Sequence, residues 1–310
     1  MSTFIYYNYQ FCKIAVPPVQ GELFSQTPAP VHPDESFARK QEILSEILAA
    51  DSTGSRKIVF RTPRGGKEHL HSYLTPYRDG LAVMKISNRR VHTTEKKDFT
   101  EESYEEYPAC IVVIDNRPDI QRIVIEKRVL AFTDVNQVQA ILQHTLRRLL
   151  HPYGLSINID QLHTRSAFWN VANDVRQYPQ GFRRVRFYLP HLNLERLKRV
   201  MNSYLIMARE SYDSDLTWTQ TATQGGKLKF DENDSLQSTL INTLMEDVGG
   251  NNVITLYPNG KGQKPVHVGE DNYRMGSMEK EVFDKLKGGD SIDREKAMDE
   301  IKQFTKRYID

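Results

Sequence analysis

Residues 109–126, ACIVVIDNRPDIQRIVIE, form the clearest structural pattern in the chain. The apolar run at 109–114 predicts a buried central strand. The sequence NRPD at 116–119 predicts a turn, because Pro118 fixes its own backbone angle near the value that turns require. In 120–126 apolar and polar side chains alternate, so this segment is expected to return antiparallel to the first strand. The two strands predict an antiparallel sheet in the core.

The segments around this pair predict further strands and helices. Upstream, residues 4–16 are rich in Tyr, Phe and Ile, which is typical of a long strand. Downstream, Asp134 precedes a helical repeat of apolar residues that ends at Tyr153-Gly154. The charged residues 94–106 predict an exposed loop or a short helix. Other strands are expected at 57–61, 67–73, 81–86, 155–162, 182–189, 214–223, 252–257 and 264–276, and other helices at 36–50, 165–178, 193–210, 235–248, 279–287 and 293–308.

These elements predict an α+β protein with mixed, largely antiparallel sheets, flanking helices and a helical C-terminus. The length of 310 residues corresponds to about two domains at ~150 residues each. We expect an N-terminal β-rich domain at 1–133, a domain of alternating strands and helices at 134–278, and C-terminal helices at 279–310.

The composition excludes several classes of protein. Apolar residues make up 39% of the chain and charged residues 26%, which is ordinary for a protein with a core. No apolar run approaches the ~18 residues of a membrane helix, and the first residues lack the features of a signal peptide. Cys12 and Cys110 are the only cysteines, which excludes a disulfide framework and a four-cysteine zinc module. We therefore expect a cytoplasmic protein without membrane insertion.

The net charge of +2 conceals blocks of opposite sign. Residues 56–97 carry a net charge of +8 and residues 120–209 a net charge of +9. The blocks 1–55, 98–119 and 210–310 carry −3, −6 and −6. Such a distribution favours a positive surface that meets nucleic acid, although it also fits basic residues on solvated faces or opposite an acidic partner.

The strongest nucleic-acid pattern lies in the strand at 182–189. Alternation places Arg184, Arg186 and Tyr188 on one face, and Arg183, Val185 and Phe187 on the other. Two arginines beside a tyrosine suit phosphate neutralisation and base stacking. The complete set of candidate nucleic-acid-binding residues is Arg184, Arg186, Arg196, Lys198, Arg199, Arg147, Arg148, Arg61, Arg64, Arg89 and Arg90. The first five are expected to form one patch, and Arg61, Arg64, Arg89 and Arg90 another.

Catalytic motifs are weak in this sequence. The glycine- and lysine-containing segment 258–264 resembles a phosphate loop but favours a plain hairpin turn. Asp115 and Glu126-Lys127 have the residue types of a metal-dependent nuclease, but the adjacent Glu and Lys point to opposite faces of a strand. Asp79 with 95–97 favours ordinary surface charges. No catalytic residue and no cofactor is predicted, and a catalytic site assembled from distant residues stays open.

Histidines and aromatic residues favour structural interpretations. His69 and His71 share a strand face, and the only further histidine of this block is His92, so a polar or phosphate-facing strand is favoured over a metal site. No metal is predicted. Core positions are expected for Tyr6, Tyr7, Tyr9, Phe11, Trp169 and Trp218.

The order of elements in residues 107–257 resembles a group of phage-defence proteins. The resemblance is carried by the segments Ile114–Asp119, Ile120–Glu126, Ala131-Phe132 and Tyr188–Asn193. The group contains RexA-type phage-exclusion proteins and the B components of Kiwa defence systems. Such relatives imply a cytosolic, dimeric DNA-binding protein without a recognised active site that often works with a partner protein. No motif aligns residue by residue, so no functional residue is transferred.

Three hypotheses follow from the sequence. The favoured one is a nucleic-acid-binding protein of an anti-phage defence system, with double-stranded DNA preferred over RNA and contacts directed at the backbone. The resemblance adds a homodimer and a second defence protein as expected partners. The alternatives are a metal-dependent nuclease or toxin, and a non-catalytic component that binds proteins or senses phage.

Overall fold

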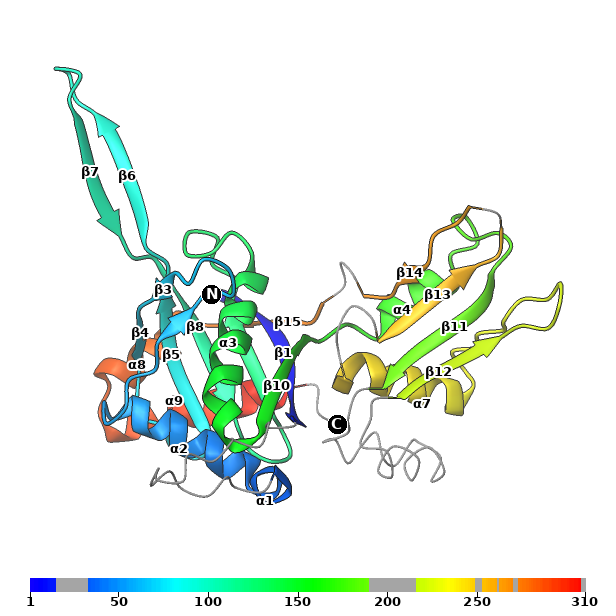
Figure 1. The fold of residues 1–310 in the computed structure, drawn as a ribbon, viewed down its shortest axis with the longest axis horizontal. Helices are drawn as coiled ribbons and strands as arrows, with labels where there is room; N and C mark the ends of the chain where they lie inside the picture. The colour runs from blue at the N-terminus through cyan, green and yellow to red at the C-terminus, as the bar shows by residue number, and fades with distance from the viewer. Residues whose placement is uncertain (15–32, 190–215, 249–252, 261, 270–272, 308–310) are drawn as a thin grey trace, which may run out of the picture. The chain divides into compact units, whose positions relative to one another are not determined.

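The computed structural model describes residues 1–14, 33–189, 216–248, 253–260, 262–269 and 273–307 (Figure 1). Within these residues, seven α-helices and 15 strands in mostly antiparallel sheets form an α+β protein, as predicted. No helix in the described ranges is both long and apolar enough to span a membrane.

The chain divides into two compact units. The first contains residues 1–5, 11–159 and 276–310, and the second contains residues 6–10 and 160–275. These limits differ from the expected boundaries at 133 and 278. The helix after residue 134 covers strands of the first unit, and the C-terminal helices pack on that unit too, because Phe4 contacts both Phe283 and Phe304 with ring centroids 5.4 and 5.5 Å apart.

The first unit is built on a seven-stranded sheet. The strand order is β10-β1-β9-β8-β5-β4, and β15 pairs with β1. The expected pair at 109–126 is confirmed as β8 and β9, with Val113 opposite Val124. The strands are β1 (Ser2–Lys13), β4 (His71–Tyr73), β5 (Leu81–Ser87), β8 (Ala109–Asp115), β9 (Arg122–Glu126), β10 (Leu155–Gln161) and β15 (Met275–Met278).

Helices complete the first unit. They are α1 (Pro33–Ala38), α2 (Lys40–Ser52), α3 (Val135–Leu150), the 3-10 turn η1 (His151–Tyr153), α8 (Lys280–Gly288) and α9 (Ser291–Lys306). Asp134 caps α3 as expected, since its side chain accepts a hydrogen bond from the backbone N–H of Asn136.

The polar residues of β8 and β9 are buried in contacts with α9 and β1. Asp115 accepts hydrogen bonds from the Arg117 guanidinium and from the Thr305 hydroxyl, both 2.6 Å long. Arg122 donates to the carbonyl oxygen of Arg307 at 2.8 Å, so the positive charge lies at the negative end of α9. The polar side chains that alternate with apolar ones in 120–126 therefore do not face solvent. They lie on a second face of the sheet, which is also covered.

The second unit contains a four-stranded sheet in the order β12-β11-β13-β14. Its strands are β11 (Phe182–Leu189), β12 (Leu216–Thr221), β13 (Ile254–Pro258) and β14 (Val266–His267), and its helices are α4 (Ser166–Ala172), α7 (Ser235–Thr243) and the π-helical turn η2 (Leu244–Val248). The predicted hairpin turn at 258–264 is confirmed, because β13 and β14 pair antiparallel across it.

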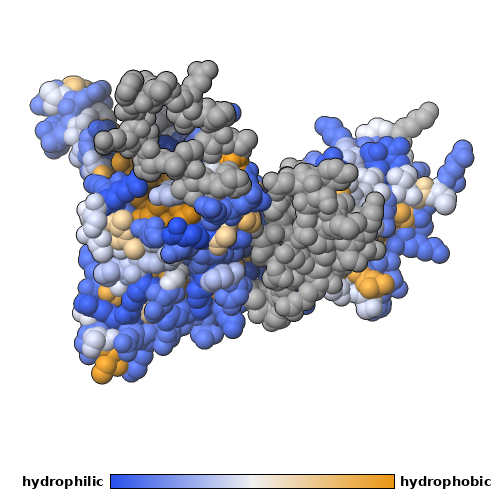
Figure 2. Space-filling view, turned by 60° about the horizontal axis from the view of Figure 1, so that its bottom comes forward, coloured by the Kyte–Doolittle hydropathy of each residue, from blue (hydrophilic) through white to orange (hydrophobic). Residues whose placement is uncertain are grey.

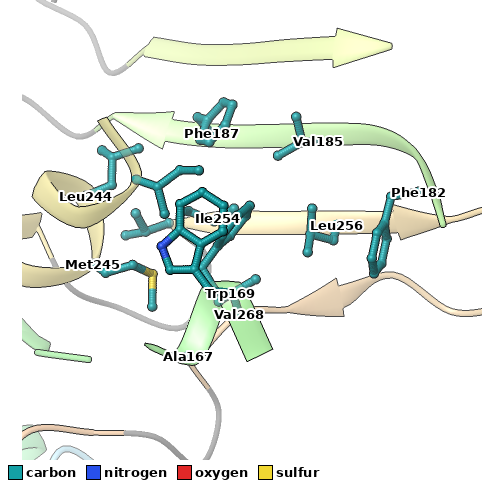
Figure 3. Close-up of a cluster of buried hydrophobic side chains, with 13 residues drawn as sticks. Ala167, Trp169, Phe182, Val185, Phe187, Leu244, Met245, Ile254, Leu256 and Val268 are labelled. Atoms are coloured by element: carbon teal, nitrogen blue, oxygen red, sulfur yellow. The ribbon is translucent and has the colours of Figure 1, made fainter. Parts of the chain in front are cut away.

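One face of this sheet packs against α4, α7 and η2 (Figure 3). Val185, Phe187 and Leu256 point from the strands toward Trp169 and Met245. The core position of Trp169 is as predicted, and Trp218 packs at its margin with its ring centroid 5.3 Å from that of Phe187. Both tryptophans of the chain therefore report on the second unit alone.

A β-ribbon stands away from the body of the first unit (Figure 1). Its strands β6 (Arg90–Glu95) and β7 (Glu101–Glu106) pair with each other and with no other strand in the described part of the chain. The expected loop or short helix at 94–106 is thus wrong. The sequence shows no alternation of apolar and polar residues here, because neither face of the ribbon packs against a core. A second small pair joins β2 (Phe60–Arg61) and β3 (Glu68–His69).

The Cys110 thiol of β8 is expected to be unreactive in the folded protein. It is buried, and burial together with the charge of Glu126 raises its pKa to about 12. In a Cys12→Ser variant at pH 8, a thiol reagent should modify Cys110 only after denaturation, measured by mass spectrometry. An unfolded cysteine ionises near pH ~8.5, so the stability from this group is complete below that pH and is lost as the pH rises toward 12. Rapid native labelling would contradict this burial.

Candidate nucleic-acid interface

The second sheet has one polar face. Arg184 and Arg186 alternate with the buried Val185 and Phe187 of β11, so both arginines lie on the face opposite the core. Directly paired residues of neighbouring strands share a face. This places three exposed threonines of β12 and two residues of β13 beside the arginines. We define the polar face as Arg184, Arg186, Tyr188, Thr217, Thr219, Thr221, Thr255, Tyr257 and His267.

Arg184 stacks on an aromatic ring of the neighbouring strand. Its guanidinium carbon lies 3.8 Å from the ring centroid of Tyr257. Its Nε atom is buried and has no hydrogen-bond partner within the described ranges. A guanidinium group is planar and positively charged, which suits both phosphate and the flat face of a base.

Arg186 lies in the next row of the same face. Its Nη2 atom donates to the hydroxyl oxygen of Thr255 at 3.4 Å, and this oxygen lies 3.3 Å from Nδ1 of His267. The described residues place no carboxylate in an ion pair with Arg184 or Arg186. Among the nine described residues that define the polar face there is no Asp or Glu.

A β-bulge moves Arg183 away from its predicted position. The register of β11 shifts between Phe182 and Arg184, so Phe182 enters the core and Arg183 is exposed. Sequence alternation had placed Arg183 on the core side. An extra residue in a bulge reverses the alternation locally, which strict periodicity does not anticipate.

Other predicted basic residues are engaged within the first unit. Arg61 forms an ion pair with Glu68 at 2.5 Å, and Arg89 forms one with Glu105. Each pair is partly exposed, and its acid cancels the charge that a phosphate would meet. Arg64 is exposed.

Three further arginines bind carbonyl oxygens. Arg90 donates to Val129 at 3.2 Å, Arg147 to Ile157 at 2.8 Å and Arg148 to Val59 at 3.0 Å. These bonds direct the guanidinium groups to the unit's own backbone. Arg196, Lys198 and Arg199 lie outside the described residues, so their predicted patch with Arg184 and Arg186 stays a prediction.

The β-ribbon is acidic rather than basic. Residues 89–106 contain four Lys/Arg and six Asp/Glu. Register places Glu95 opposite Glu101, and Lys96 pairs with Glu102 at 3.1 Å. The adjacent blocks of opposite charge in the sequence thus fold onto each other, and the ribbon does not offer a surface that attracts phosphate.

The residues considered for metal chemistry have structural partners. Glu126 accepts hydrogen bonds from the Ser2 hydroxyl and the Ile111 amide at 2.7 and 3.0 Å. His71 bonds Asp51 at 2.7 Å, and His69 bonds the carbonyl of Ser87 at 3.0 Å. The sequence predicts a polar or phosphate-facing strand that carries both histidines on one face. His69 instead lies in β3 and His71 in β4, and both side chains are buried, so the phosphate-facing part is wrong. Across the described residues no group of three or more His, Cys, Asp or Glu side chains is placed to hold a metal ion.

Sequence reasoning missed Tyr257 and the three threonines of β12. The threonines could have been found from the alternation Leu-Thr-Trp-Thr-Gln-Thr at 216–221, in which every second residue is a threonine. The contact between Arg184 and Tyr257 could not be predicted from the sequence, because long-range pairing decides which strand lies beside Arg184.

The surface in Figure 2 is mostly hydrophilic on the side shown, with small apolar areas between polar ones.

Comparisons of the chain with protein-family models, with curated proteins and with solved structures gave no match. The polar face is therefore interpreted from its own chemistry.

Proposed function

We propose that the polar face of the second sheet binds nucleic acid. The observation that carries this proposal is the Arg184–Tyr257 stack beside Arg186, on a face without carboxylates. Arg184 and Arg186 would neutralise backbone phosphates, and the exposed threonine hydroxyls would donate hydrogen bonds to phosphate or sugar oxygens. The planar guanidinium of Arg184 would also stack on a base.

The face supports a single strand more directly than the duplex DNA favoured by the sequence. Bases within a duplex are stacked on each other, whereas unpaired bases expose flat faces to aromatic rings and guanidinium planes. A role in phage defence and a homodimer rest on the resemblance alone and stay proposals, as does the choice of DNA over RNA.

The test is fluorescence anisotropy with labelled single-stranded DNA, duplex DNA and RNA over a salt series, with and without magnesium. We expect the single strand to bind most tightly and affinity to fall with salt, since each neutralised phosphate contributes a slope of about −0.7 for single strands. Absence of binding at low salt would contradict the proposal. Loss of the probe only with magnesium would favour the nuclease hypothesis instead.

A further inference from the structure

A hollow of about 730 Å³ opens at one end of the second sheet. Three segments line it: the entry to β11, the loop after β12, and the start of the β13–β14 turn. Asn259 ties these segments together, since its amide side chain donates to the carbonyls of Gln180 at 3.0 Å and Gly226 at 3.4 Å, and its backbone N–H donates to Gly181 at 2.8 Å. The lining residues are Gln180, Arg183, Thr221, Ala222, Thr223, Gln224, Gly225, Gly226, Lys227, Asn259 and Gly260.

The residues that line the hollow are mostly positively charged or polar, and none is acidic. The lining contains two cations, Arg183 and Lys227, with amide and hydroxyl side chains between them and no Asp or Glu. It contains one small apolar side chain, Ala222, and no aromatic ring. Such a lining does not favour an apolar ligand or a stacked base. It matches an anion with many acceptor oxygens, and phosphate is the anion that Arg and Lys recognise in nucleic acids.

Local backbone geometry turns Arg183 outward and leaves room for the side chain of Lys227. The β-bulge of β11 turns Arg183 out of the core. Gly181 adopts φ +64°, and a Cβ atom there would approach Cδ of Lys227 to 3.1 Å. Because Gly181 has no Cβ atom, the aliphatic part of the Lys227 side chain can pack beside it. A larger residue at 181 would displace this side chain. Both cations are exposed.

The hollow is continuous with the polar face. Thr221 lines the hollow and also pairs with Arg184 across β11 and β12. We propose that the hollow binds a phosphate group of the nucleic-acid strand whose bases lie on the polar face. Its volume lies within the ~300–1,000 Å³ typical of ligand sites, so a phosphate fits together with its sugar. The inference rests on the proposed function and adds a fixed phosphate position to it.

The test compares the double variant Arg183→Gln/Lys227→Gln with a matched control, Arg176→Gln/Lys229→Gln. The control removes the same charge from exposed residues of the same unit that do not line the hollow. The probes are single-stranded DNA with a 5′-phosphate, with a 3′-phosphate and with hydroxyl groups at both ends. Tryptophan fluorescence melts verify that each variant is folded.

We expect the hollow variant to bind at least about 10-fold more weakly than the control, and its salt slope to shrink by about 1.4, because each cation accounts for about 0.7. If only one phosphate-ended probe loses affinity, the hollow holds a terminal phosphate. An equal loss for all three probes assigns it to an internal phosphate. Equal affinities and slopes for hollow variant and control would overturn the inference. Absence of binding by the natural protein would overturn the proposed function and the inference with it.

Discussion

Replacing Arg184 and Arg186 together with Glu is expected to lower nucleic-acid affinity by about 100-fold or more. Each charge-assisted hydrogen bond to phosphate is worth about 1.5–3 kcal/mol, and the two introduced carboxylates would repel the backbone. The measurement is anisotropy with the single-stranded probe at low salt. Both side chains are only partly buried, so the melting temperature should change little.

A charge-matched control separates this face from the general charge of the protein. Arg176→Glu/Lys229→Glu introduces the same charge change into exposed residues of the same unit, away from the polar face. We expect it to weaken binding by less than about 10-fold, through long-range repulsion that salt screens. Equal losses in the two double variants would show that the polar face is not the binding surface.

A third variant tests the stacked geometry. Arg184→Lys keeps the charge and removes the planar guanidinium that lies on Tyr257. We expect a weakened single-strand complex whose salt slope is nearly unchanged, because the charge stays. An unaltered affinity would limit Arg184 to a simple electrostatic role.

Truncation of Glu246 to Ala is expected to destabilise the second unit by about 3–5 kcal/mol. Glu246 pairs with both Arg165 and Arg274, and its side chain and that of Arg274 are each 8% exposed. The variant removes the carboxylate that contacts both arginines, one of them buried, and this costs far more than the loss of a surface pair.

Chemical denaturation followed by tryptophan fluorescence measures this effect, because both tryptophans belong to the second unit. Glu232→Ala serves as control, since Glu232 is exposed in the same unit, and its effect should stay within about 0.5 kcal/mol. A similarly small effect of Glu246→Ala would contradict the stabilising role of this carboxylate.

The sequence predicts the elements with a covered face far better than those without one. The β8–β9 pair follows from the apolar run at 109–114 and the turn after it. The arginine face of β11 follows from alternation, because burial on one side of that strand selects apolar residues at every second position. The β-ribbon lacks such selection, since its strands meet solvent on both faces. The position of Arg183 depends on a bulge, and the Tyr257 stack depends on which strands pair. Both are set by long-range contacts that local periodicity does not encode.

The β-ribbon also bears on whether copies of the protein pair through their strand edges. Each of its strands has an outer edge with no partner strand in the described part of the chain. Free edges of this kind can pair with other chains and start aggregation. Strand β7 carries four glutamates, Glu101, Glu102, Glu105 and Glu106, so two ribbons that paired along this edge would bring like charges together. The acidic residues that make the ribbon a poor phosphate surface are therefore expected to oppose edge-to-edge assembly as well.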